Sequence, residues 1–259
     1  MKLTLTLAAA ALGTIVTVAG AAYADDAPSW GSLSAYVAVT TDYRFRGISQ
    51  NDRGFSEQGS LNWSGPYGFY AGTWVAKTNW TGVAYCPTCG ATPTVEVDLY
   101  GGKHFDLGGT DLNVEAYYYS YPDANASMLG TYASYFEGIT QLSHSFDALT
   151  LTGTLAYSPE WSLKGGTGWY LEGTASYALT DWLSISGNLG HQWVQRAPTD
   201  YTHWDIGASA TYKGFTLDAR YVGNDIKTSD YSFWMGSGPK AIEDGFVATI
   251  TYNIANLFQ

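Results

Sequence analysis

Residues 149–155, with the sequence LTLTGTL, alternate apolar and hydroxyl-bearing side chains with a period of two. Leu149, Leu151 and Leu155 share one phase of this pattern, and the threonines between them share the other. Successive side chains of a β-strand point to opposite sides of the backbone. The stretch therefore predicts a strand with one apolar face and one polar face.

The same alternation recurs from one end of the chain to the other. Nine further segments show it clearly: 32–46, 55–63, 95–99, 112–116, 169–176, 183–189, 203–210, 215–220 and 246–254. Segment 132–143 alternates weakly, and segment 68–76 is apolar on both phases, so the facing of its side chains is left open. Together these segments predict about twelve strands, each about 9–12 residues long, which is the length a tilted strand needs to cross a bilayer.

The connections between the predicted strands alternate between short and long. The short ones are turn-like and span 65–66, 107–110, 146–148, 180–181 and 213–214. The long ones span 47–54, 79–93, 121–130, 158–167, 194–201 and 223–244. This rhythm is typical of outer-membrane barrels, which have tight turns at the periplasmic end and longer loops outside. A soluble sandwich with Greek-key crossovers gives no reason for it.

We therefore predict an all-β fold, an up-and-down antiparallel transmembrane β-barrel of the outer-membrane type. A ring of about twelve strands encloses more space than its own side chains fill, so the apolar phase is expected to face lipid and the polar phase the lumen. Closure is required because an open sheet edge in hydrocarbon leaves backbone groups unpaired. Aromatic residues near strand ends are expected to form girdles at the membrane interfaces: Tyr43, Phe45, Trp63, Trp169, Trp193, Trp204, Tyr212 and Tyr221.

The N-terminus predicts export. Lys2 precedes an apolar run over residues 3–22, and Ala22-Tyr23-Ala24 fits the small-x-small pattern of a signal peptidase site. We expect residues 1–24 to be a cleaved signal peptide and residues 25–259 to form a single barrel domain in the outer membrane of a Gram-negative bacterium. After Ala24 no stretch is apolar for long enough to form a membrane-spanning helix.

Composition and charge narrow the function. Charged residues make up 14% of the chain, which also holds 21 Tyr and 10 Trp, and the formal net charge of −11 argues against nucleic acid as a partner. Cys86 and Cys89 stand in a Thr- and Pro-rich loop, where we expect a disulfide that staples the loop rather than a redox motif. No metal site and no cofactor is expected.

Several motifs resemble the TorF-type porin family of proteobacterial outer membranes. The opening motif is DYRFRGISQ at residues 42–50. Shorter matches follow in the family's order: EVDLYGG at 96–102, YYYSYP at 117–122, YFE at 135–137, YSP at 157–159, YLE at 170–172 and DARY at 218–221. The resemblance implies a porin-like barrel over nearly the whole mature chain. It supplies neither a substrate nor a catalytic residue.

The charged residues of the polar phase are the candidates for a pore lining. The acidic ones are Asp42, Glu96, Asp98, Glu115, Glu137, Glu172, Asp205 and Asp218, and the basic ones are Arg44, Arg46 and Arg220. Buried charges must pair, yet carboxylates remain in excess. Because carboxylate rings favour cations, we expect a mildly cation-selective path for the passive diffusion of small solutes. Tyr117, Tyr119 and Tyr121 are expected to fill space, with stacking on a sugar or nucleobase as the alternative.

Two other functional classes stay open. An outer-membrane lipase would carry a nucleophile and a His on the lipid face, where His191 has the required phase, but no partner residues must lie beside it. We therefore expect no enzyme. The other class is a structural or adhesive barrel that does not conduct. The expected partners are outer-membrane lipid, the permeant solute and the barrel-assembly machinery, for which Phe258 near the C-terminus is a recognition feature. The oligomeric state is left open.

Overall fold

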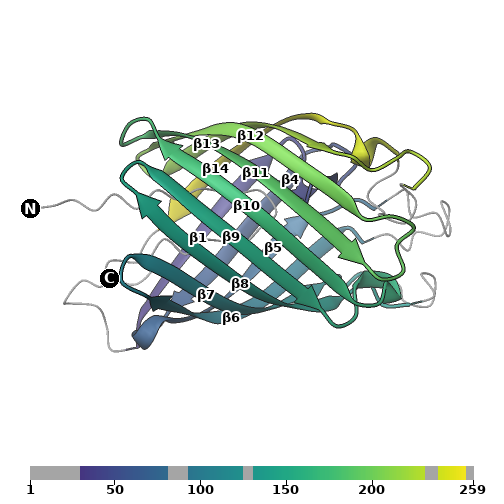
Figure 1. Cartoon of the computed structure of the whole chain (residues 1–259), viewed down its shortest axis with the longest axis horizontal. Helices are drawn as coiled ribbons and strands as arrows, with labels where there is room; N and C mark the ends of the chain where they lie inside the picture. The colour runs from purple at the N-terminus through teal and green to yellow at the C-terminus, as the bar shows by residue number, and fades with distance from the viewer. Residues whose placement is uncertain (1–29, 81–92, 125–130, 231–238, 255–259) are drawn as a thin grey trace, which may run out of the picture.

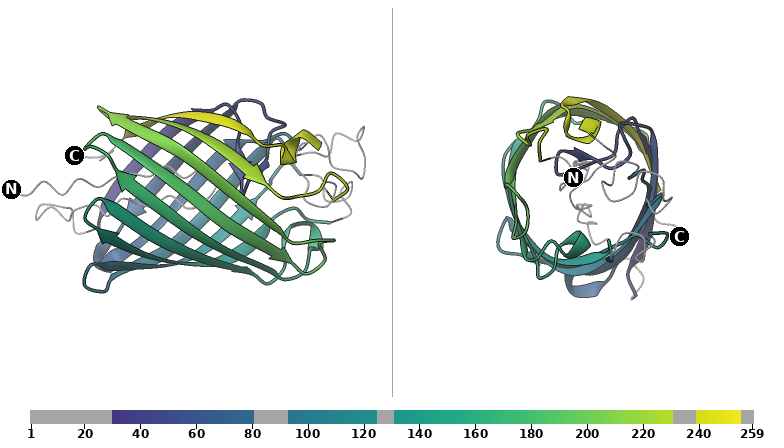
Figure 2. Two further views of the ribbon diagram at one scale, coloured as in Figure 1. Left: turned by 45° about the horizontal axis from the view of Figure 1, so that its top comes forward. Right: turned by 90° about the vertical axis from the view of Figure 1, so that its right-hand side faces the viewer.

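The computed structural model describes residues 30–80, 93–124, 131–230 and 239–254. Within these ranges, long antiparallel strands form one closed barrel in which each strand pairs with its neighbours in the chain and β1 closes the ring by pairing with both β4 and β14 (Figure 1). The end-on view shows the closed ring (Figure 2). The predicted up-and-down barrel of about twelve strands is confirmed.

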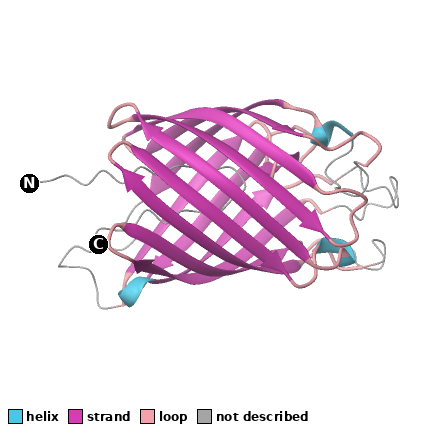
Figure 3. Ribbon diagram, viewed as in Figure 1, coloured by secondary structure: helices cyan, strands magenta, loops and turns pink. Residues whose placement is uncertain are grey.

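The barrel strands are long and similar in length. They are β1 Ser32–Thr40, β4 Ser56–Ser64, β5 Phe69–Lys77, β6 Val95–Asp106, β7 Thr110–Ser120, β8 Tyr135–Phe146, β9 Leu149–Ser158, β10 Gly168–Ala178, β11 Leu183–Val194, β12 Tyr201–Tyr212, β13 Phe215–Asn224 and β14 Gly245–Ile254. Two short strands, β2 Arg44–Phe45 and β3 Ile48–Ser49, pair with each other only. Three short 3-10 turns lie outside the strands (Figure 3): η1 Pro66–Gly68, η2 Ser162–Lys164 and η3 Pro239–Ile242. Among the described residues, no helix has the length and apolar character needed to span a membrane.

The two faces of the barrel follow the sequence pattern. On β9, Leu151 and Leu155 are 44% and 45% exposed on the outside, whereas Thr154 on the opposite phase is 2% exposed inside. The outer face thus carries large apolar side chains, and the inner face is dominated by polar, tyrosine and small side chains. The structure also settles the facing of β5, where Phe69 and Val75 point outward while Tyr70 is buried inside.

Tight turns and long connections segregate to opposite ends of the barrel. The turn between β12 and β13 consists of Lys213 and Gly214, with φ values of 47° and 84°. Positive φ at both central residues gives the backbone twist that suits a two-residue hairpin turn. The long connections gather at the other end, as the extracellular loops of outer-membrane barrels do.

One predicted strand boundary is wrong. The alternating segment 32–46 was expected to be a single strand, but β1 ends at Thr40 and the chain then turns into the β2–β3 hairpin inside the barrel. Tyr43 is buried inside and Phe45 packs against lumenal side chains, so neither belongs to the outer girdle. Alternation continues through a hairpin as it does through a long strand, which is why the pattern did not reveal the turn.

Candidate functional site

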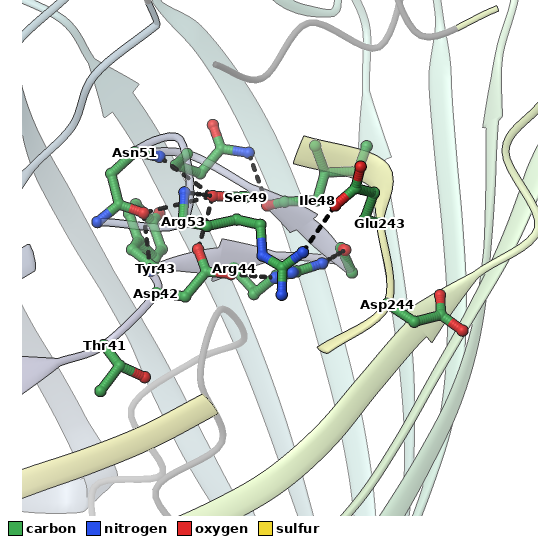
Figure 4. Close-up of polar contacts among 12 residues, drawn as sticks. Thr41, Asp42, Tyr43, Arg44, Ile48, Ser49, Asn51, Arg53, Glu243 and Asp244 are labelled. Atoms are coloured by element: carbon green, nitrogen blue, oxygen red, sulfur yellow. Dashed lines mark hydrogen bonds and ion pairs between the residues drawn. The ribbon is translucent and has the colours of Figure 1, made fainter. Parts of the chain in front are cut away.

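The segment 41–55, which connects β1 to β4, folds into the lumen and is held by its own side chains. The carboxylate of Asp42 accepts hydrogen bonds from Nε of Arg44 and Oγ of Ser49, both at 2.6 Å. The amide of Tyr43 donates to Oδ1 of Asn51 at 3.1 Å (Figure 4). Asp42 and Arg44 therefore stabilise this segment internally. We call residues 41–55, which include the β2–β3 hairpin, the inner hairpin.

Arg46 anchors the inner hairpin to the barrel wall. Its Nη1 and Nη2 donate to the two carboxylate oxygens of Glu137 on β8, at 3.0 and 2.7 Å, and Nη1 also donates to Oε1 of Gln192 on β11 at 2.6 Å. The guanidinium carbon lies 3.9 Å from the ring centroid of Tyr170 on β10. Burial disfavours the charged guanidinium, but the charge and hydrogen bond of Glu137, together with Tyr119 and Tyr135, outweigh that effect, and the pKa of Arg46 rises above its ordinary value.

The tip of the inner hairpin docks on β12 and β13. Gly47 has φ +84°, and a Cβ at this position would lie 2.6 Å from Cβ of His203. Tyr201 donates its hydroxyl to the carbonyl of Arg46 at 3.1 Å, and Asn224 donates its side-chain amide to the carbonyl of Gly47. The site thus requires a residue without a side chain at position 47, for both its conformation and its contacts.

The third lumenal arginine is paired within the wall. Arg220 on β13 donates from Nε and Nη2 to Asp218, both at 2.7 Å, and from Nη1 to Asp205 on β12 at 2.6 Å. Asn188 on β11 donates to the other oxygen of Asp205 at 2.8 Å. These residues form a connected network of charges on β11–β13 in which every carboxylate has a partner.

The remaining lumenal carboxylates accept hydrogen bonds from tyrosines instead. Glu96, Asp98, Glu115 and Glu172 have no arginine partner among the described residues. The tyrosine hydroxyls that donate to them are those of Tyr43 and Tyr121 to Glu96, Tyr117 to Asp98, Tyr70 to Glu115 and Tyr170 to Glu172. Three of these four acids lie on β6 and β7, so the lumen has an acidic, tyrosine-rich side facing a side that carries the arginines.

Glycines on neighbouring strands let tyrosine rings lie flat against this acidic side. A Cβ at Gly72 would lie 2.6 Å from the ring of Tyr100, and a Cβ at Gly102 would lie 2.6 Å from the hydroxyl of Tyr70. The ring of Tyr100 stacks on Tyr117 with 5.2 Å between centroids, and ring contacts continue through Tyr119. Rings that cover glycines line the wall rather than cross the lumen.

The lumen differs in character along its axis. At the level of the inner hairpin, interior residues are almost fully buried: Arg46 is 3% exposed, Glu137 1% and Tyr170 0%. Toward the tight turns, β8–β11 present small hydroxyl side chains such as Thr152 and Ser186 that are only half-buried. The interior therefore combines a packed level at the hairpin with a more open, hydroxyl-lined part on the turn side.

The structure places all eleven predicted lining residues inside the barrel. Asp42, Arg44 and Arg46 belong to the inner hairpin, and the other eight lie on the wall, where Asp205 is half-buried and the rest are buried. Sequence reasoning missed the tyrosines that satisfy the carboxylates and missed Gln192. The alternation at Tyr117, Tyr119 and Glu115 signalled a shared face, but only the fold shows which groups meet across strands.

The remaining sequence predictions concern His191, a metal site, the two cysteines and the two ends of the chain. His191 lies on the outer face of β11, as its phase predicted, with Nδ1 2.8 Å from Oγ1 of Thr202 and its ring against Trp193. Over the ranges that the structure describes, no group of three or more His, Cys, Asp and Glu side chains could hold a metal ion. Cys86 and Cys89, the predicted signal peptide 1–24 and Phe258 lie outside the described residues.

Comparison with known proteins identifies the family. The family described as "Bacterial protein of unknown function (Gcw_chp)" matches residues 24–257, almost the whole chain. The chain belongs to this family. The TorF name, suggested by the motifs, is not part of that description and stays a prediction. No curated protein matches the sequence of this Gcw_chp member.

Solved porins share the fold of this Gcw_chp barrel. The KdgM porin aligns with a TM-score of 0.56 and 8% identity, covering 85% of this chain and 98% of that chain. The NanC porin aligns with a TM-score of 0.54 and 8% identity, covering 87% and 100%. A structure titled as the KdgM porin in complex with disordered oligogalacturonate gives a TM-score of 0.53 at 7% identity, covering 88% and 99%. At these identities the likeness shows a common barrel architecture.

Proposed function

We propose that this protein is a porin-like channel of the outer membrane that passes small solutes by diffusion, with the inner hairpin at its narrowest level. The observation that carries the proposal is a closed barrel with an apolar outside and a polar inside. An apolar outer face is the surface that membrane lipid requires, and a polar interior offers a path to solutes that lipid excludes. The shared fold with the KdgM and NanC porins supports the same function.

The charges of the lumen support mild cation selectivity. Eight carboxylates face three arginines in the interior, and the acids without an arginine partner cluster on β6 and β7. A surplus of negative charge along a narrow path raises the local concentration of cations and lowers that of anions. The permeant class that this predicts is small and neutral or positively charged.

Reversal potentials in planar bilayers test this function. Purified protein inserted between unequal KCl solutions should conduct and give a reversal potential of the sign that K⁺ preference produces. The variant Glu115→Gln should shift that potential toward zero, whereas Glu57→Gln should not, because Glu57 is exposed and pairs with Lys77 outside the lumen. A reversal potential of the opposite sign would contradict the selectivity, and silent membranes would contradict the open channel.

The packed level at the inner hairpin favours a second candidate, a barrel that is closed at rest. The buried pair of Arg46 and Glu137 holds the hairpin across the lumen. If the wild-type barrel is silent and a variant that breaks this pair conducts, the hairpin is a plug. If both are silent, the barrel has a structural or adhesive role. Phospholipid hydrolysis by the wild type that is lost in His191→Ala would instead establish the lipase class.

A further inference from the structure

Three carboxylates on the acidic side of the lumen lack a positive partner. Glu96 and Asp98 are each 1% exposed and Glu115 is 4% exposed. Among the described residues, no Lys, Arg or His nitrogen lies within ion-pair distance of them, and their donors are tyrosine hydroxyls and one backbone amide. Burying carboxylates with neutral donors alone is costly, and a bound cation would remove that cost.

Glu115 shows where that cation can bind. Its Oε2 accepts the hydroxyl of Tyr70 at 2.7 Å, but its Oε1 is buried and has no hydrogen-bond partner. Leaving a buried acceptor of this kind unpaired destabilises the protein, and more so when the acceptor is charged. The residue faces the lumen and pairs in register with Gly102, over which the hydroxyl end of Tyr70 lies.

The spacing of the three acids selects an extended cation. Glu96 and Asp98 share a face of β6 two residues apart, which places them about 7 Å from each other along the strand. Glu115 pairs with Gly102, four residues beyond Asp98, which adds about 14 Å along the strand direction. The step of about 14 Å to Glu115 is too long for the three acids to chelate one metal ion together, in agreement with the lack of a group of three or more metal-ligating side chains among the described residues.

Aromatic rings occupy the intervals between the acids. Tyr117 donates to Asp98 and stacks on Tyr100, and Tyr70 donates to Glu115 and lies against His104. The face of a tyrosine ring carries negative potential. It packs against methylene groups, including those next to an ammonium group. A chain of methylenes that carries ammonium groups at intervals matches this order of rings and carboxylates.

We propose that the acidic side of the lumen, built from Glu96, Asp98 and Glu115 with Tyr70, Tyr100 and Tyr117, binds linear aliphatic diamines and polyamines. This inference rests on the proposed channel and names its substrate class. The ammonium groups bind at the carboxylates and the methylene chain lies along the tyrosines. At Glu96 an ammonium competes with the hydroxyl of Tyr43, the 3.1 Å hydrogen bond through which the inner hairpin contacts this wall.

Block of KCl current measures this binding in the reconstituted protein. Spermidine, putrescine, butylamine and Mg²⁺ are added in turn to the bilayer chamber. Each additional ammonium group that reaches a carboxylate contributes about tenfold in affinity, if it is worth about 1.4 kcal/mol. We expect spermidine to block at about tenfold lower concentration than putrescine, and putrescine at about tenfold lower concentration than butylamine. Equal block by putrescine and Mg²⁺, which carry the same charge, would overturn the proposal, because charge alone would then explain the block.

Variants locate the site. Glu115→Gln and Asp98→Asn should each raise the half-blocking concentration of spermidine about tenfold, while the exposed control Glu57→Gln should leave it unchanged. Heat-modifiable electrophoretic mobility checks that each variant folds. Should a variant not fold, the comparison of putrescine with Mg²⁺ on the wild type still decides. Unchanged block in both folded variants would overturn the assignment.

Calorimetric titration of the detergent-solubilised protein separates this inference from the channel itself. A wild-type barrel that binds spermidine more tightly than butylamine but carries no current would contradict the channel and support the binding site. A barrel that conducts K⁺ yet binds the amines equally would contradict the binding site alone. Binding of neither amine in either assay would overturn the inference.

Discussion

Arg46 and Glu137 lie 91 residues apart in the sequence and form a two-point ion pair inside the barrel, with Nη1–Oε1 and Nη2–Oε2 distances of 3.0 and 2.7 Å. Both side chains are 1% exposed. The pair joins the inner hairpin to β8, the strand that lies on the far side of the lumen from β1 in the order of the barrel. The position of the hairpin depends on this contact, because a buried charge that loses its partner is strongly destabilising.

Substitution of Arg46 should release the inner hairpin. In Arg46→Ala the buried carboxylate of Glu137 loses its partner, which costs about 3–5 kcal/mol. We expect a lower urea midpoint of the detergent-solubilised barrel and a larger single-channel conductance. Arg46→Lys should recover only part of the loss, because an ammonium cannot make the planar two-point contact. A wild-type conductance in a folded Arg46→Ala barrel would contradict the anchoring role.

Substitution of Gly47 tests the docking of the hairpin tip. Gly47→Ala forces a side chain into the left-handed region at φ +84° and within 2.6 Å of His203. The conformation alone costs about 1–2 kcal/mol, and the contact adds to it. Gly109→Ala is the matched control, since Gly109 has φ +92° but a Cβ there would meet nothing within 4 Å. A larger loss of stability in Gly47→Ala than in Gly109→Ala, measured by urea unfolding, isolates the contact with His203.

Substitution of Gly72 should narrow the lumen without changing charge. A Cβ in Gly72→Ala would lie 2.6 Å from the ring of Tyr100, so the ring must leave the wall and turn toward the path. We expect a reduced single-channel conductance with unchanged ion selectivity. Gly153→Ala on β9 is the control, because a Cβ there has no neighbour within 4 Å. Equal conductance in the two variants would show that the flat tyrosine does not bound the path.

A charge placed on the outer face should destabilise the barrel according to depth. Ile206 lies at the middle of β12 and is 68% exposed on the outside. Ile206→Arg should cost about 2–4 kcal/mol in lipid, whereas Tyr212→Arg at the end of the same strand should cost about 0–1 kcal/mol. Urea unfolding in lipid vesicles measures the difference. Equal costs would contradict the placement of β12 across the bilayer.

The alternating pattern predicted the barrel well because its physical basis is local. Leu151 and Thr154 belong to opposite phases of one strand, and the phase alone determines which face each takes once one face meets an apolar medium. The alternation of short and long connections further predicted that strands consecutive in the chain are neighbours in the barrel. The same reasoning failed at Thr40, where Tyr43 and Phe45 continue the alternation although the strand has ended.

The sequence by itself determined that a two-faced sheet forms, that it closes, and which side chains of its alternating strands face the lumen, because strand periodicity acts between immediate neighbours. Only the tertiary structure decided that residues 41–55 fold inward, that Arg46 pairs with Glu137, and that tyrosines rather than arginines donate hydrogen bonds to Glu96, Asp98 and Glu115. These contacts join side chains from different strands, so they depend on the register and curvature of the closed ring, which no local pattern encodes.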